Sequence, residues 1–240
     1  MQCYTTQSKN IRLLVPLLLA LNLQGVLQEV YLRNSMLKVI LSSLLLLSLA
    51  QANDPSKGRC ELSQEGAFGV NFVAYKTAAK KGVGASFDSV KYTAVSPVGK
   101  NFREILVGSS VVIETKSVNS KNKGRDEKLV KFFFQNMKGD TITAKILDYK
   151  AIKVAKGEPK KGTLITEITM NGVTKHVPMN YMLKDGVLKA DGVIDIFDFS
   201  GNVALAAINK ACFDLHQGKT WNDVAISFTT KIKAVCYPAK

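Results

Sequence analysis

The side chains whose spacing could support chemistry are few in this sequence. Its 240 residues contain two histidines, His176 and His216. Two imidazoles need a further ligand to hold a metal ion, and no residue stands at the usual metal-site spacing to supply it. Asp191, Asp195 and Asp198 form a carboxylate series, but the first two occupy outward-facing positions of a strand pattern. We therefore predict neither a metal site nor a cofactor.

Catalytic motifs are equally absent from the sequence. It contains no Gly-x-Ser-x-Gly nucleophile motif, no glycine-rich phosphate loop and no Ser/His/Asp arrangement. We therefore predict a protein that is not an enzyme.

The net charge of +14 is spread along the chain. No basic stripe alternates with aromatic residues, so we do not expect nucleic acid as a partner. Such a surface favours solubility or contact with anionic lipid headgroups.

The N-terminal region resembles a targeting sequence. The charged start Met36-Leu37-Lys38 precedes an apolar run from Val39 to Leu49 and a small-residue end, Ala50-Gln51-Ala52. A membrane anchor is the alternative, but the apolar run is shorter than the roughly 20 residues that a spanning helix needs. We predict that Met36 is the true start of the protein and that 1–35 is an upstream extension added by a start codon assigned too early. We further predict a cleaved signal peptide over 36–52 and one exported domain over 53–240.

Apolar and polar residues alternate with a period of two through most of 53–240. Ile142, Ala144 and Ile146, for example, alternate with polar neighbours. About eight segments have this pattern, and turn pairs such as Asn171-Gly172 favour hairpins between them. Eight antiparallel strands with one apolar face can close into a barrel that is wide enough for one slender ligand. A two-sheet sandwich would show the same alternation.

Two segments depart from the strand pattern and predict helices. Asp126 to Met137 is typical of a short helix with acidic residues in its first turn. Ser200 to His216 is typical of a longer helix, with Ser200 as its N-cap and His216 at its end, where a protonated imidazole suits the helix dipole. We expect the longer helix to lie across one barrel mouth.

Three cysteines follow the signal peptide, an odd number for an exported protein. Cys60 precedes the first predicted strand and Cys236 follows the last, and these positions meet if the first and last strands of a closed barrel pair. We predict a Cys60–Cys236 disulfide, with Cys212 as a reduced thiol on the apolar stripe of the helix. A Cys212–Cys236 pair is the alternative.

Several motifs in this order resemble the YceI-like family of periplasmic lipid-binding proteins. They are Ser117-Val118-Asn119-Ser120 followed by Lys123 to Leu129 and Phe132-Phe133-Phe134, Gly162-Thr163-Leu164 leading into Asn171 to Lys175, and the strand pair Val70-Asn71-Phe72 with Gly84 to Phe87. Thr220 to Val224 with the preceding helix is similar to the cysteine-containing branch of that family in epsilonproteobacteria. The resemblance covers nearly all of 53–240.

The resemblance implies an all-β fold, an eight-stranded antiparallel lipocalin-like barrel, in a periplasmic protein. It also implies a long apolar ligand such as a polyisoprenoid, an isoprenoid quinone, a prenyl phosphate or a fatty amide, and a possible homodimer. The protein would then be a carrier or store of this lipid. The alternative is a secreted interaction protein with a filled barrel, whose basic surface binds an acidic partner or an anionic membrane.

Residues at the inward-facing positions of the predicted strands are the candidates for lining the barrel, and Phe133 of the short helix is the candidate at its mouth. Tyr181 is the candidate for a polar contact, because a buried hydroxyl needs a partner. The full predicted set is Phe72, Phe87, Val111, Ile113, Phe133, Ile146, Ile168, Met179, Tyr181, Leu188, Ile194, Ile226 and Phe228.

Overall fold

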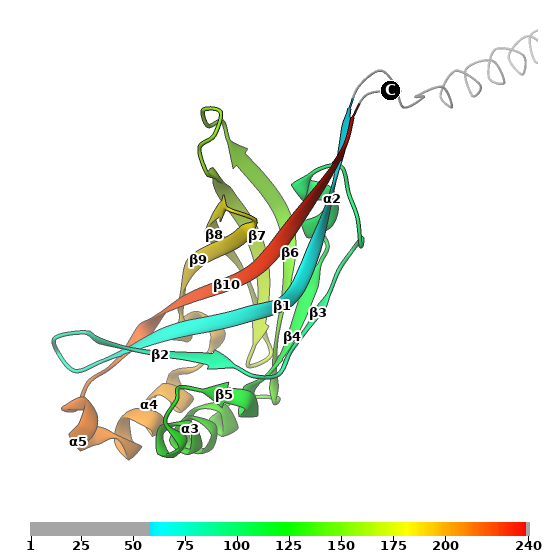
Figure 1. Cartoon of the computed structure of the whole chain (residues 1–240). Helices are drawn as coiled ribbons and strands as arrows, with labels where there is room; N and C mark the ends of the chain where they lie inside the picture. Colours follow the sequence, from blue (N-terminus) through cyan, green and yellow to red (C-terminus); the bar gives the residue numbers. More distant parts are fainter. Residues whose placement is uncertain (1–57, 239–240) are drawn as a thin grey trace, which may run out of the picture. The chain divides into compact units, whose positions relative to one another are not determined.

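The computed structural model describes residues 58–238, so the predicted extension and signal peptide lie outside the described residues. Most of this region forms one antiparallel sheet (Figure 1). Within it the strands are β1 (Arg59–Lys76), β2 (Lys81–Phe87), β3 (Val90–Thr93), β4 (Ser110–Glu114), β5 (Val118–Asn119), β6 (Thr141–Ile152), β7 (Lys160–Met170), β8 (Val173–Lys184), β9 (Val187–Asp195) and β10 (Thr220–Tyr237). The α-helices are α2 (Phe102–Leu106), α3 (Lys123–Lys128), α4 (Asn202–Ala211) and α5 (Phe213–His216).

Two interrupted strands explain why the described region has ten strands where the sequence predicts eight. β2 and β3 are separated only by Asp88 and Ser89, and β4 and β5 only by the short 3₁₀ turn η1 (Thr115–Ser117). The backbone N–H groups of Asp88 and Glu114 donate across this break to the carbonyls of Ser117 and Ser89. β2 pairs with β5, and β3 pairs with β4, so both pairs continue one antiparallel ladder.

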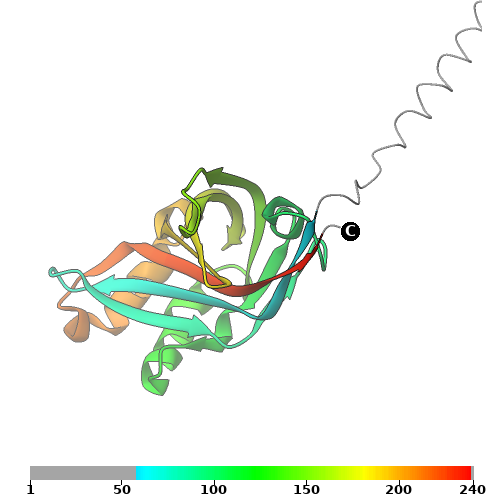
Figure 2. The ribbon, with the colours of Figure 1, turned by 45° about the horizontal axis from the view of Figure 1, so that its top comes forward.

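This ladder joins the two ends of the strand order. The order runs β3-β4-β6-β7-β8-β9-β10-β1-β2-β5. When β2–β3 and β4–β5 are each counted as one strand, the sheet curls into a ring of eight (Figure 2). The predicted antiparallel lipocalin-like barrel is confirmed, and the sandwich alternative is wrong.

Turn chemistry and periodicity account for the register of the central hairpins. Asn171-Gly172 joins β7 to β8, and Asp185-Gly186 joins β8 to β9. All four residues have positive φ angles of 50° to 74°, the backbone that a two-residue type I′ turn requires. The turns therefore set which residues of β7, β8 and β9 share the inner face.

The predicted short helix begins earlier than expected and is not uniform. Its segment contains α3, then the π-helical turn η2 (Leu129–Phe133) and the 3₁₀ turn η3 (Phe134–Asn136). Asn122 caps α3, because its side-chain oxygen accepts a hydrogen bond from the N–H of Arg125.

The predicted longer helix is divided at Cys212 into α4 and α5, and the prediction of Ser200 as its N-cap is wrong. Ser200 adopts a left-handed conformation (φ 55°) that ends the preceding 3₁₀ turn η4 (Ile196–Phe199). Gly201 takes the N-cap position of α4. A Cβ on Gly201 would lie 2.5 Å from Cγ2 of Ile196, so only glycine fits this close approach.

The helical segments lie at opposite ends of the barrel (Figure 1). The small helix α2 lies near one end, with Ile105 and Leu106 completely buried. α3, α4 and α5 gather at the other end. Among residues 58–238, no helix is long and apolar enough to span a membrane, and no group of three metal-ligating side chains is present.

The predicted Cys60–Cys236 disulfide is confirmed, and Cys212 is a buried free thiol. Cys60 and Cys236 are register partners in the β1–β10 ladder. The bond joins residues 176 positions apart, beyond the end of the barrel that carries α2. It therefore constrains nearly the whole described chain when unfolded.

Removing this disulfide should lower the free energy of unfolding. In the chain-entropy account, a loop of this length contributes about 3–5 kcal/mol. We expect a Cys60→Ala/Cys236→Ala double variant to show that loss in denaturant titration. Cys212→Ala is the control and should lose less. A double variant as stable as the unmodified protein would contradict the prediction.

Candidate ligand-binding cavity

A cavity of about 550 Å³ occupies the half of the barrel next to α3, α4 and α5. Its walls come from β1 to β4 and β6 to β10, together with the helical segments α3, η2 and α4. Inward residues such as Phe72, Phe87 and Ile226 remain only half-buried because they line this space. Inward residues at the other end, Leu164 and Leu188, are completely buried. The barrel is therefore hollow at one end and filled at the other.

An aromatic layer forms the floor of the cavity. Phe68 stacks on Tyr92 and on Phe228, with ring centroids 4.8 Å apart in both pairs. Phe68 turns inward because β1 has a register shift against β10 between Glu65 and Gly69. Sequence reasoning missed Phe68 because the bulge breaks the period of two, although flanking Gly66 and Gly69 were a visible signal.

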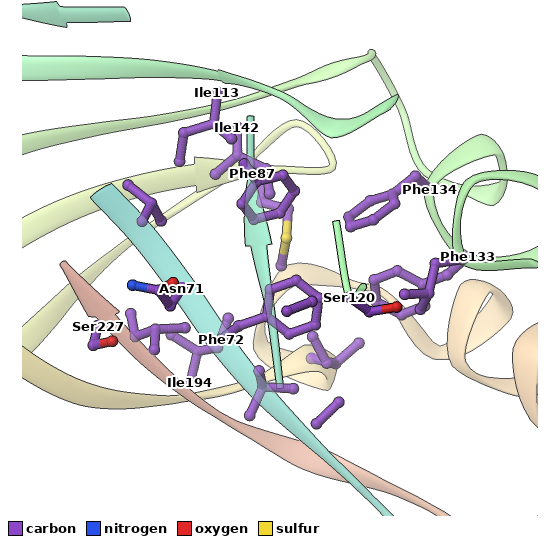
Figure 3. Close-up of a pocket in the computed structure, with 18 of the residues that line it drawn as sticks. Asn71, Phe72, Phe87, Ile113, Ser120, Phe133, Phe134, Ile142, Ile194 and Ser227 are labelled. Carbon is purple, nitrogen blue, oxygen red and sulfur yellow. The ribbon is translucent and has the colours of Figure 1, made fainter. Parts of the chain in front are cut away.

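Eleven of the thirteen predicted lining residues border the cavity. They are Phe72, Phe87, Val111, Ile113, Phe133, Ile146, Ile168, Met179, Ile194, Ile226 and Phe228. The aromatic members continue towards the helices, where Phe87 contacts Phe72 and Phe134 at centroid distances of 5.5 and 6.0 Å (Figure 3). The wall is thus apolar along its length.

Tyr181 and Leu188 do not border the cavity. Both face inward, as parity predicts, but they lie in the filled end. The ring of Tyr181 stacks on Tyr149 at 5.1 Å, and Tyr149 on Phe102 of α2 at 5.9 Å. Burial is the main cause that raises the pKa of Tyr181, and the Tyr149 hydroxyl adds a smaller effect. The hydroxyl of Tyr181 makes no hydrogen bond of normal geometry within the described chain.

The helical stripe on which the sequence placed Cys212 supplies lining residues. Leu205 and Ile208 of α4 border the cavity, together with Cys212 at the C-cap position of this helix. This stripe closes the end of the barrel beside η2. The helical spacing in the sequence indicated that these residues are buried, but it did not indicate that they border a cavity.

Polar atoms are few along the cavity. Tyr92 and Thr166 border it, but their hydroxyls are buried and have no hydrogen-bond partner within the described residues. The hydroxyl of the buried Ser120, by contrast, has hydrogen-bond partners. It donates to Asp126 and accepts from Nε of Arg125, and these two bonds hold α3 against the wall.

The cavity reaches the surface among charged residues that sequence reasoning did not place beside it. Lys76 of β1 and Lys128 of α3 border it together with His216 and Trp221. Against the sequence expectation of a protonated His216, burial first and then Lys76 and Lys128 lower the pKa of its imidazole. Nothing in the spacing of these residues predicts that they meet, because they come from four separate elements.

The fold and cavity define a lipocalin-like barrel of the kind that encloses a small apolar ligand. The sequence model of the YceI-like domain matches residues 63–232, and the chain belongs to that family. None of the functionally curated proteins matches this sequence.

Among solved structures, a polyisoprenoid-binding domain from Saccharophagus degradans shares this fold. It is 16% identical, with a TM-score of 0.50, and the match covers 73% of this chain and 98% of that one. BcnA of Burkholderia cenocepacia is 15% identical (TM-score 0.44, 69% and 96% covered). The YceI protein of Campylobacter jejuni is 21% identical (TM-score 0.41, 67% and 86% covered).

Filling the hollow and filled ends should have different effects on stability. Ala144 borders the cavity, whereas the fully buried Ala190 does not. We expect Ala144→Phe to change the free energy of unfolding by less than about 1 kcal/mol and Ala190→Phe to lower it by at least about 2 kcal/mol through overpacking. Denaturant titration measures both. Equal losses would show that the barrel is not hollow beside Ala144.

Removing the Tyr181 hydroxyl should not destabilise the protein. An unpaired buried hydroxyl costs about 1–3 kcal/mol, so Tyr181→Phe should unfold at the same or a higher denaturant concentration. A loss above about 1 kcal/mol would mean that the hydroxyl has a partner.

Proposed function

We propose that this protein binds a long apolar chain, such as a polyisoprenoid, an isoprenoid quinone or a fatty amide, as its carrier or store. The observation that carries the proposal is an apolar cavity of about 550 Å³ that lies inside the barrel and reaches the surface at one end. This volume lies in the range of ordinary ligand sites. The Saccharophagus domain is described as polyisoprenoid-binding, and that ligand class fits this cavity.

Apolar burial supplies enough free energy for such binding. A ligand chain that buries about 600 Å² gains roughly 15 kcal/mol before the costs of association and ordering. Micromolar or tighter affinity then needs little polar contact in the walls. The proposal is accordingly one of binding, without a chemical reaction.

We further propose that the protein works after export, in the periplasm. The Cys60–Cys236 disulfide supports an oxidising compartment, as does the predicted signal peptide over 36–52. Peripheral contact with an anionic membrane and assembly as a homodimer stay predictions. The alternative of an interaction protein with a filled barrel has less support, because one end of the barrel is hollow.

Mass spectrometry of an organic extract tests the proposal. The full-length gene is expressed with export, and the protein is purified without detergent. We expect an apolar species in about equimolar amount, which Ala144→Phe should lose because its ring occupies the cavity.

Thr143→Phe is the matched control, because Thr143 is the exposed neighbour of Ala144 on the outer face of β6. It should retain the species. A clean extract from folded protein that also fails to take up added isoprenoid would overturn the proposal.

A further inference from the structure

The surface end of the cavity brings together cationic side chains from three elements. Lys76 comes from the end of β1, Lys128 from the end of α3 and His216 from the end of α5. All three border the cavity, and both lysines act electrostatically on His216. Within the described chain, neither lysine makes an ion pair. The site therefore has positive charge that no neighbouring carboxylate neutralises.

Other charged groups near this end are committed elsewhere or exposed. The guanidinium of Arg125 is bonded to the hydroxyl and carbonyl of Ser120, beside Asp126. Asp223 of β10 is paired with Lys80 at 2.7 Å. The neighbours of His216 on its own segment, Asp214 and Lys219, are exposed.

The hydrogen bonds of His216 fix which ring nitrogen can gain a proton. Asn209 donates from Nδ2 to the carbonyl of Gly218, so its Oδ1 accepts the hydroxyl proton of Thr220. Thr220 Oγ1 then has no proton left for the imidazole and accepts from Nδ1 of His216 at 2.7 Å. Nδ1 thus carries the proton of the neutral ring, and protonation adds the second N–H at Nε2.

We propose that Lys76, Lys128 and His216 form a binding site for the oxyanionic headgroup of an apolar ligand, and that binding there takes up a proton at His216. This inference rests on the proposed function, because the headgroup is held at the end of a chain that lies in the cavity. A phosphate, sulfate or carboxylate head meets the requirement, since each accepts several hydrogen bonds from cationic donors.

The direction of the proton linkage follows from the charges. In the free protein, burial and the two lysines keep the pKa of His216 below its usual value, so the ring is neutral at pH 7. A bound anion offsets both lysines and raises the pKa of the ring. Affinity for an anionic ligand therefore increases as pH falls through the bound-state pKa, and it levels off below the free-state pKa.

Decyl sulfate and decanol separate the headgroup from the chain. The sulfate keeps one negative charge from pH 5 to pH 8, so a change in its affinity comes from the protein. Trp221, the one tryptophan of the sequence, borders the cavity and supplies a fluorescence signal for binding. At constant ionic strength, we expect about tenfold tighter binding of decyl sulfate at pH 5 than at pH 8, which corresponds to one unit of pKa. Decanol binding should not change.

Matched variants assign the effect to this site. His216→Gln should abolish the pH dependence and keep the pH 8 affinity, whereas Lys76→Gln/Lys128→Gln should weaken decyl sulfate at both pH values and leave decanol unchanged. His176→Gln is the control for the other histidine of the described chain, which faces Glu167 on the outer surface at 3.5 Å. Lys184→Gln controls for the loss of a positive charge elsewhere on the protein. Lys184 is exposed and follows Tyr181 by three residues, at the filled end of the barrel.

The outcomes distinguish the two proposals. Binding of both compounds with equal affinity and no pH dependence overturns the headgroup site and keeps the apolar cavity. A pH dependence that survives His216→Gln overturns the proton linkage. Binding of neither compound by folded protein, together with a clean extract and no uptake of added isoprenoid, overturns the proposed function itself.

Discussion

The stacking of Phe68 between Tyr92 and Phe228 is the constraint on which the rest of this structure depends. An eight-stranded barrel has just enough interior to be filled by its own side chains or to hold one small ligand. The three rings close the interior partway along, and the bulge in β1 is what brings Phe68 into that layer. On the side of α2 the interior is filled by side chains around Leu164, and on the side of α3, α4 and α5 a cavity remains.

This division separates stability from binding along one axis. The filled end contains α2 and the stacked tyrosines, and the disulfide joins β1 to β10 beyond it. These features hold the ring of strands together without occupying the cavity. The hollow end is covered by short helical segments, and its surface opening is basic. A ligand chain would therefore meet apolar walls and an aromatic floor, while its headgroup would stay among cations.

Sequence patterns predicted the inner face of the barrel well, because a strand has a period of two and the two hairpin turns fix its register. They could not predict depth along the barrel axis. Parity gives Tyr181 and Met179 the same face, yet only Met179 borders the cavity. Phe68 was missed because its bulge breaks the period, and Lys76, Lys128 and His216 because only the tertiary fold brings them together. The cysteine pairing was predictable, since it needs only that the first and last strands pair.

A crystal structure of the exported protein, purified without detergent and without added lipid, tests the central claim most directly. The account predicts one elongated, continuous ligand density that runs from the layer of Phe68, Tyr92 and Phe228 to the opening between Lys76, Lys128 and His216. A barrel in which Phe72, Phe87 and Phe133 have repacked to fill this space, with no room for a ligand chain, would contradict it.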